Sequence, residues 1–152
     1  MIKIRLIAVG KVKEDYFRKA TEEYIKRLSR FCEFEIAEVK DETLGEKEKI
    51  LSIEGERIER AARGYKVALA VEGKKYSSEE FAALIKKAID RGVGEISFII
   101  GGSYGIDERV KNECDVKISF SDMTFPHTMM RVLFTEQLYR AFTIINNAEY
   151  HK

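Results

Sequence analysis

Cysteine, histidine and proline are scarce in this chain, and each scarcity narrows what the protein can be. The two cysteines, Cys32 and Cys114, lie far apart and form no C-x-x-C pair, which argues against a disulfide framework and indicates a reducing compartment. The two histidines, His127 and His151, are too few for a histidine-rich metal site, so we expect no metal. The single proline, Pro126, excludes linkers stiffened by proline.

Long apolar runs and an excess of one charge are also missing. No apolar run approaches the roughly 20 residues needed to span a bilayer, and Lys3 and Arg5 interrupt the apolar start, unlike in a signal peptide. With 27 basic and 26 acidic residues the formal net charge is +1, so the whole chain is not a general nucleic-acid binder, although a local basic patch remains possible. We therefore expect a cytoplasmic protein that does not contact a membrane.

What is present is typical of a soluble globular protein. The 152 residues are 45% hydrophobic and 35% charged, which is enough for one domain over residues 1–152 with a substantial core. Strand-like apolar segments alternate with segments of helical period. The expected strands cover residues 2–9, 34–39, 66–71, 95–100 and 116–120, and the expected helices cover residues 15–31, 47–63 and 77–89, a segment after residue 105 and a long segment from residue 126.

This alternation predicts an α/β fold, with a mostly parallel sheet and helices on both faces. Gly64 is expected to cap the second helix, and Ser77 with Glu80 to form a capping box at the third. Pro126 suits the first turn of the last helix. Residues 43–52 are the most charged and least patterned, and we expect them to be mobile.

Two loops that follow apolar strands are candidates for a binding site. They are Gly-Gly-Ser-Tyr-Gly at 101–105 and Ser-Asp-Met-Thr-Phe-Pro at 121–126. Ligands of open α/β sheets gather beyond the carboxyl ends of strands, and glycine lets a ligand approach the backbone. Neither the dinucleotide fingerprint nor the P-loop pattern is present. Taken singly, the first loop is also consistent with a tight turn and the second with N-capping.

A third strand end, Leu-Ala-Val-Glu-Gly at 69–73, repeats the arrangement of strand and glycine. If the three strands are neighbours in the sheet, their loops converge on one pocket.

The last helix and the tail carry further polar candidates. Glu136 and Arg140 have the favourable i, i+4 spacing of a surface pair, and Arg140 also lies where an anionic substrate could bind. The tail Tyr-His-Lys at 150–152 has the composition of a frayed end, and a functional role requires it to fold back over the pocket. Two pairs of lysines are either phosphate contacts or solvated loop residues: Lys11 with Lys13, and Lys74 with Lys75.

Several motifs in order resemble one known family. Ile-Gly-Gly-Ser-Tyr-Gly at 100–105, Phe-Ser-Asp-Met-Thr-Phe-Pro-His at 120–127 and Glu-Gln-Leu-Tyr-Arg-Ala at 136–141 precede the terminal Tyr-His-Lys, and Ile-Ala-Val-Gly-Lys stands at 7–11. Together they resemble the RlmH family of large-subunit ribosomal RNA methyltransferases, in the SPOUT superfamily. The resemblance covers the whole chain. It implies a C-terminal trefoil knot, which general topology rules make very rare.

The resemblance also implies a reaction. Members of the family methylate N3 of pseudouridine 1915 in helix 69 of 23S rRNA, in assembled ribosomes, with S-adenosylmethionine as cofactor. They form homodimers in which the partner subunit completes each pocket. The cofactor site implied here consists of residues from the three loops: Leu69, Gly101, Phe120, Ser121, Asp122, Met123, Thr124 and Phe125.

Catalytic and RNA-binding roles follow from the same resemblance and from side-chain chemistry. His151 is a candidate base, or a group that orients the base, because its unperturbed pKa lies near neutrality. Arg140 can stabilise negative charge on the uracil oxygens, and Tyr150 can stack on a base. The candidate RNA contacts are Arg131, Lys152, Lys11 and Lys13. Within the loops, Tyr104 and Ile106 replace the residues more common in the family.

Two other functions stay open. A non-catalytic ribosome- or RNA-binding protein with this fold would not bind S-adenosylmethionine, and the intact loops argue against it. A small-molecule or nucleotide enzyme with a Rossmann-like pocket would bind NAD or ATP, and the missing fingerprints argue against it.

Overall fold

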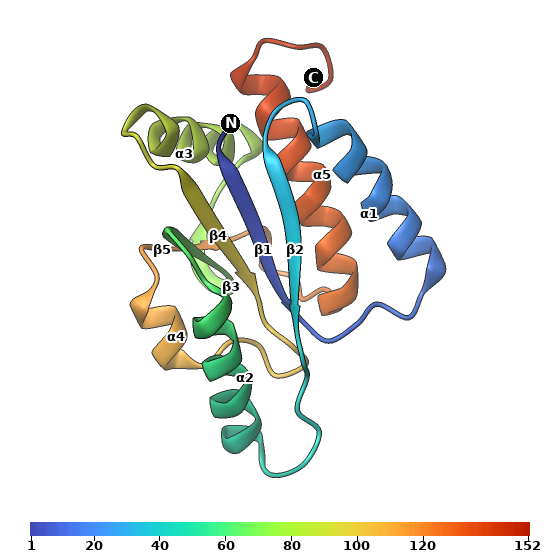
Figure 1. The fold of residues 1–152 in the computed structure, drawn as a ribbon, viewed down its shortest axis with the longest axis vertical. Helices are drawn as coiled ribbons and strands as arrows, with labels where there is room; N and C mark the ends of the chain where they lie inside the picture. Colours follow the sequence, from blue (N-terminus) through green and yellow to red (C-terminus); the bar gives the residue numbers. More distant parts are fainter.

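Five strands and five helices alternate along the chain in the computed structural model, which describes all 152 residues (Figure 1). The strands are β1 (Lys3–Val9), β2 (Glu33–Val39), β3 (Tyr65–Lys75), β4 (Glu95–Ile100) and β5 (Val116–Ser119). The helices are α1 (Asp15–Leu28), α2 (Lys47–Ala61), α3 (Ser78–Asp90), α4 (Glu108–Glu113) and α5 (His127–Ile145). The sheet has the order β2-β1-β4-β3-β5, and every pair of neighbours is parallel, as the alternation predicted.

Apolar side chains on the two faces of the sheet build two separate cores. Leu6 and Phe98 belong to the core that α1, α3 and α5 cover, whereas Ile7 and Ile99 belong to the core under α2 and α4. Successive residues of a strand point to opposite faces, so consecutive apolar residues imply that both faces are buried. This confirms the prediction of helices on both faces (Figure 1). None of the helices has the length and apolar character needed to cross a membrane.

Helix α5 packs against both α1 and α3, and its buried face differs from the predicted one. The helical period of the sequence predicts an apolar stripe at Met129, Leu133, Leu138, Phe142 and Ile145. Leu138 and Phe142 are buried as expected, but Leu133 is half-buried while its neighbour Phe134 is fully buried, with its ring centroid 4.8 Å from that of Phe98. Apolar residues occur all around this helix, so the sequence period alone does not select the face that meets the core.

Several helix ends differ from the predicted ones. The capping box is confirmed, since Ser77 Oγ accepts from Glu80 N at 3.1 Å and Glu80 Oε1 accepts from Ser77 N at 3.0 Å. Helix α1 ends at Leu28, three residues early. Pro126 precedes α5 as its N-cap rather than lying in its first turn.

The second helix differs at both ends. Residues 47–52, part of the segment expected to be mobile, form the start of α2. At the other end the cap is Ala62 in an extended conformation, and Gly64, with φ of +67°, follows outside the helix.

Strand β3 is longer than predicted, and it is irregular. Leu69 and Lys74 both pair with Ile118 of β5, so residues 70–73 bulge out of the ladder. Gly73 makes the return possible, because a Cβ there would lie 2.8 Å from the backbone of Ile118. The third strand therefore does not end near Val71, and the bulge itself becomes a wall of the site.

Candidate functional site

A cleft of about 700 Å³ opens at the carboxyl ends of β4, β3 and β5. Its walls are residues 69–72 of the β3 bulge, the loop 100–106 after β4, and residues 119–121 and 123–127 after β5. The three loops converge because β3 lies between β4 and β5 in the sheet. The predicted pocket is thus confirmed, and we call it the first cleft.

The loop after β4 is closed so tightly that only backbone faces the first cleft at its start. A Cβ on Gly101 would lie 2.3 Å from the carbonyl carbon and oxygen of Gly105, a distance that no side chain tolerates. Gly105 has a φ of +85°, and its N–H donates to the carbonyl of Gly102 at 3.0 Å. The segment is therefore both a tight turn and a wall of the cleft, so the two interpretations of its sequence are compatible.

The loop after β5 is held from within. Ser119 Oγ donates to the carbonyl of Ser121 at 2.9 Å, and Met123 N donates to Ser121 Oγ at 3.0 Å. The ring of Phe120 turns into the core, with its centroid 5.7 Å from that of Phe81. These contacts preform the loop without a ligand.

Most of the residues expected at the cofactor site line the first cleft, and one does not. Asp122 is exposed outside it, and its carboxylate pairs with the ammonium group of Lys75. That pair also occupies Lys75, one of the lysines considered as a phosphate contact. The residues found in the cleft are Leu69, Gly101, Phe120, Ser121, Met123, Thr124 and Phe125.

Lys111 of α4 also lines the first cleft, and no sequence pattern pointed to it. Its side chain is only 10% exposed and pairs with Glu72 of the bulge and, at 2.8 Å, with Glu108. Burial acts to lower the pKa of Lys111, but the two carboxylates outweigh it and raise the pKa overall. The ammonium group thus stays charged and ties the bulge to α4.

The tail lies at the opposite end of the molecule from the first cleft. In Figure 1 the strand arrows point down toward the start of α5, whereas the C-terminus lies above the far end of this helix. Arg140 is 13 residues beyond His127, or about 20 Å along the helix. A functional role requires the tail to fold back over the pocket, and within one chain it does not, because α5 separates the two.

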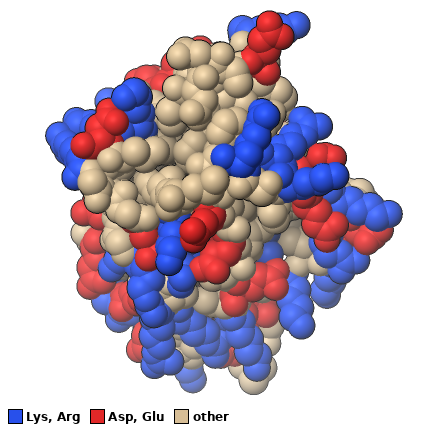
Figure 2. Space-filling view, turned by 45° about the horizontal axis from the view of Figure 1, so that its top comes forward, with Lys and Arg blue, Asp and Glu red and all other residues tan.

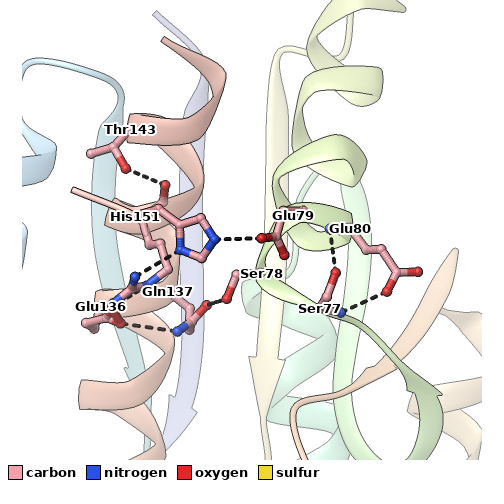
Figure 3. Close-up of polar contacts among 9 residues, drawn as sticks. Ser77, Ser78, Glu79, Glu80, Glu136, Gln137, Thr143 and His151 are labelled. Carbon is pink, nitrogen blue, oxygen red and sulfur yellow. Dashed lines mark hydrogen bonds and ion pairs between the residues drawn. The ribbon is translucent and has the colours of Figure 1, made fainter. Parts of the chain in front are cut away.

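His151 is held between two helices instead of being frayed. Its Nδ1 lies 3.1 Å from Arg140 Nη1, and its Nε2 lies 2.6 Å from Glu79 Oε1 of α3 (Figure 3). A guanidinium can only donate, so Nδ1 accepts and Nε2 carries the proton that is donated to Glu79. Both ring nitrogens are then occupied, and His151 has no free lone pair to act as a base in this arrangement.

Tyr150 and Arg140 belong to the same cluster. Arg140 pairs with Glu136 at 2.6 Å, which confirms the predicted i, i+4 pair, and the guanidinium carbon lies 4.8 Å from the ring centroid of Tyr150. The Tyr150 hydroxyl reaches Glu136 Oε1 at 3.5 Å. Burial, with further contributions from Tyr24 and Glu136, raises the pKa of Tyr150 to about 12. We call Arg140, Tyr150 and His151 the tail cluster.

Arg131 is not available to RNA. Its side chain is 3% exposed, pairs with Glu38 of β2, and donates to the carbonyls of Val9 at 3.2 Å and Gly10 at 2.6 Å. The expected phosphate contact is therefore replaced by a structural one, which joins α5 to the ends of β1 and β2. The sequence did not show this, since Glu38 lies 93 residues away.

A second cleft of about 1140 Å³ adjoins the first and shares residues 102–104 and His127 with it. Lys11 and Lys13, both candidates for RNA contacts, are exposed and line this second cleft. Lys152 is exposed at the end of the tail, far from both clefts.

With this geometry in place, the chain can be compared with known proteins. A family model described as "Predicted SPOUT methyltransferase" matches residues 2–151. A ribosomal RNA large subunit methyltransferase H from Limosilactobacillus reuteri is 48% identical over 98% of this chain and 99% of its own length. One from Streptococcus uberis is 46% identical over 99% and 100%. The chain belongs to this family of SPOUT methyltransferases.

Solved structures of other proteins share this fold at low sequence identity. A probable methylase family protein from Haemophilus influenzae superposes with a TM-score of 0.56 at 17% identity, covering 99% of this chain and 70% of that one. A putative methyltransferase from Legionella pneumophila, solved with the bound cofactor SAM, gives 0.50 at 9% identity, covering 95% and 66%.

Proposed function

We propose that this protein is an S-adenosylmethionine-dependent methyltransferase that modifies N3 of a pseudouridine in helix 69 of 23S rRNA within assembled ribosomes. Membership in the family of ribosomal RNA large subunit methyltransferase H supports the reaction class and the ribosomal substrate. The observation that carries the assignment to this chain is the first cleft, where the family motifs at 100–105 and 120–127 meet the strand end at 69–72.

The residues of the first cleft fit the cofactor. Leu69, Ile106 and Phe125 offer apolar surface to an adenine ring, and the backbone of residues 100–105 offers donors and acceptors to its edge. Gly101 permits the close approach that such backbone contacts require. S-adenosylmethionine, when bound, supplies a methyl group already activated by its sulfonium, so the protein's task is to position N3 and help it lose its proton.

A homodimer would bring the tail cluster to the first cleft. Half-buried residues of α5 form a stripe that faces away from the sheet, apolar in its first half at Met129, Val132 and Leu133 and polar at Glu136 and Arg140. If a second copy packs its α5 antiparallel along this stripe, each tail cluster lies beside the start of the other α5, at the first cleft. Two-fold dimers are the commonest protein assembly, and one antiparallel contact generates two equal sites.

The surface agrees with an interface near the tail. Figure 2, which brings forward the end where the tail lies, shows an area without Lys, Arg, Asp or Glu in its upper half, with charged side chains below it. Cores of subunit interfaces are depleted in charge in this way.

In this dimer the tail cluster supplies the chemistry. The partner subunit's Arg140 stabilises negative charge that develops on the uracil oxygens, and its Tyr150 stacks on a base. Its His151 accepts the N3 proton at Nδ1, after that nitrogen separates from Arg140 and its lone pair becomes free, or orients the group that accepts the proton.

Labelled methyl transfer to whole ribosomes tests the proposal. We expect transfer to ribosomes that carry the helix 69 pseudouridine, none to ribosomes that lack it or are already methylated, and a large loss in the His151→Ala variant. Calorimetry with S-adenosylmethionine, NAD and ATP separates the alternatives, since a binding protein takes none of the three and a Rossmann-like enzyme takes NAD or ATP. Full methylation of ribosomes without the pseudouridine would refute the target, and full activity of the His151→Ala variant would refute that residue's role.

A further inference from the structure

The second cleft holds an exposed aromatic ring that the fold does not require. Tyr104 stands on the ridge between the two clefts with 50% of its surface exposed, and the Lys47 ammonium lies 5.9 Å from its ring centroid. Phe and Tyr side chains placed beside lysines are the usual platforms on which unpaired bases stack. The position of Tyr104 therefore indicates a base-binding surface rather than a packing role.

Charges in the second cleft are mixed. Lys11 and Lys13 are exposed at its edge, which suits a phosphate. Five carboxylates also line it, and of these Glu38 is paired with Arg131 and Glu42 with Arg57. A ligand that is only an anion would be repelled by the remaining acids, Glu14, Asp41 and Glu54.

Two of those acids have a buried oxygen without a partner. Glu54 is 5% exposed, and its Oε2 accepts from Glu42 N at 3.1 Å, but its Oε1 accepts from nothing. Glu14 Oε2 is in the same condition. Buried acceptors without donors cost free energy, so a ligand that carries N–H donors is favoured here. Exocyclic amino groups of bases are such donors, and carboxylates accept from them.

We propose that the second cleft binds an unpaired nucleotide of the substrate RNA that flanks the methylated base and carries an exocyclic amino group, as adenine, cytosine and guanine do. Tyr104 stacks on this base, Glu54 accepts from its amino group, and Lys11 with Lys13 contacts its phosphate. The shared wall at residues 102–104 places this subsite directly beside the first cleft. The identity of the ligand as RNA rests on the proposed function.

Ribosome methylation kinetics test the stacking. We expect Tyr104→Ala to raise KM for ribosomes about ten-fold, from the loss of one base stack, while the Kd for S-adenosylmethionine changes less than about two-fold. Tyr104→Phe keeps the ring and should restore KM. Tyr16→Ala is the matched control, since Tyr16 is 66% exposed and lies outside both clefts. An unchanged KM in Tyr104→Ala, or a parallel loss of cofactor affinity, overturns the proposal.

A direct titration tests the base preference. The chain has no tryptophan, so Tyr104→Trp introduces a single fluorescent reporter at the subsite. We expect 5′-AMP and 5′-CMP to quench it at concentrations several-fold lower than 5′-UMP. Glu54→Gln in the same background should reduce that preference, because an amide can donate to the uracil O4. Equal quenching by all three, or none, contradicts the subsite.

The two experiments fail separately. If the wild-type protein does not methylate ribosomes, the proposed function is wrong, and the titration alone decides the subsite. Selective quenching by AMP and CMP then supports a nucleotide site, and its absence removes it.

Discussion

The first cleft and the tail cluster each hold half of the proposed site, and they are built differently. The cleft is formed within one chain by three strand ends whose loops are closed by their own hydrogen bonds. The tail cluster lies about 20 Å away along α5, where Arg140 and His151 are engaged with Glu136 and Glu79. In the proposed dimer, one subunit can therefore bind the cofactor alone, whereas methyl transfer requires the tail cluster of its partner.

The largest effect is expected from a substitution that deforms the first cleft and leaves the tail cluster intact. Gly101→Ala introduces a Cβ where Gly105 backbone lies 2.3 Å away, so the loop must shift. We expect affinity for S-adenosylmethionine to fall by at least about 100-fold, measured by calorimetry. Gly94→Ala is the control, because no atom lies within 4 Å of its added Cβ. Equal affinities in the two variants would mean that the loop after β4 does not bind the cofactor.

Mixing inactive variants tests whether the site is shared between subunits. Gly101→Ala retains an intact tail and His151→Ala an intact cleft, so a mixed dimer has one complete site only if tail and cleft come from different chains. Random exchange makes about half of the dimers mixed, so activity should rise from near zero to about a quarter of the wild-type value. No recovery after verified subunit exchange contradicts a shared site.

Substitution of Arg131 tests whether this residue has a structural role or contacts RNA. Arg131→Met should lower the free energy of unfolding by about 2–3 kcal/mol, because it leaves Glu38 and two carbonyls without a donor. Urea denaturation measures this loss. Arg60→Met, at an exposed position of α2, should change stability by less than about 0.5 kcal/mol. If the Arg131→Met protein is as stable as the wild type but has a raised KM for ribosomes, Arg131 contacts RNA and its role is not structural.

The smallest expected effect concerns Cys32, a buried residue of the core that α1, α3 and α5 cover. Burial raises the pKa of its thiol from the ordinary value of 9.0 to about 12, so the folded state favours the neutral form. The contribution of the neutral thiol to the free energy of unfolding is fully present below about pH 9 and is lost as the pH rises toward 12. Between pH 7 and 9.5 we expect about 1 kcal/mol less stability in urea unfolding.

The Cys32→Ala variant gives the control for this pH dependence. It should be less stable at pH 7, because it leaves a cavity, but its stability should change less between the two pH values. The same pH dependence in both proteins would assign the effect to other groups.

Sequence patterns located the parts of the site better than their arrangement. Patterns of an apolar strand followed by glycine or polar residues correctly identified the loops at residues 101–105 and 121–126, because the turn after a buried strand favours glycine and polar residues whatever surrounds it. They did not show that Asp122 turns outward to Lys75, or that Lys111 enters the cleft from α4. Those outcomes depend on partners that are 47 and 39 residues away.

By itself, the sequence determined the α/β alternation, the parallel sheet with two buried faces and the family, since each rests on local period or on ordered motifs. Only the tertiary structure decided the strand order that makes the three loops converge, the burial of Arg131 and the separation of the tail from the cleft of its own chain. The physical reason is the separation along the chain of the residues that interact. Local propensity fixes where elements begin and end, but contacts between distant segments decide which side chains meet.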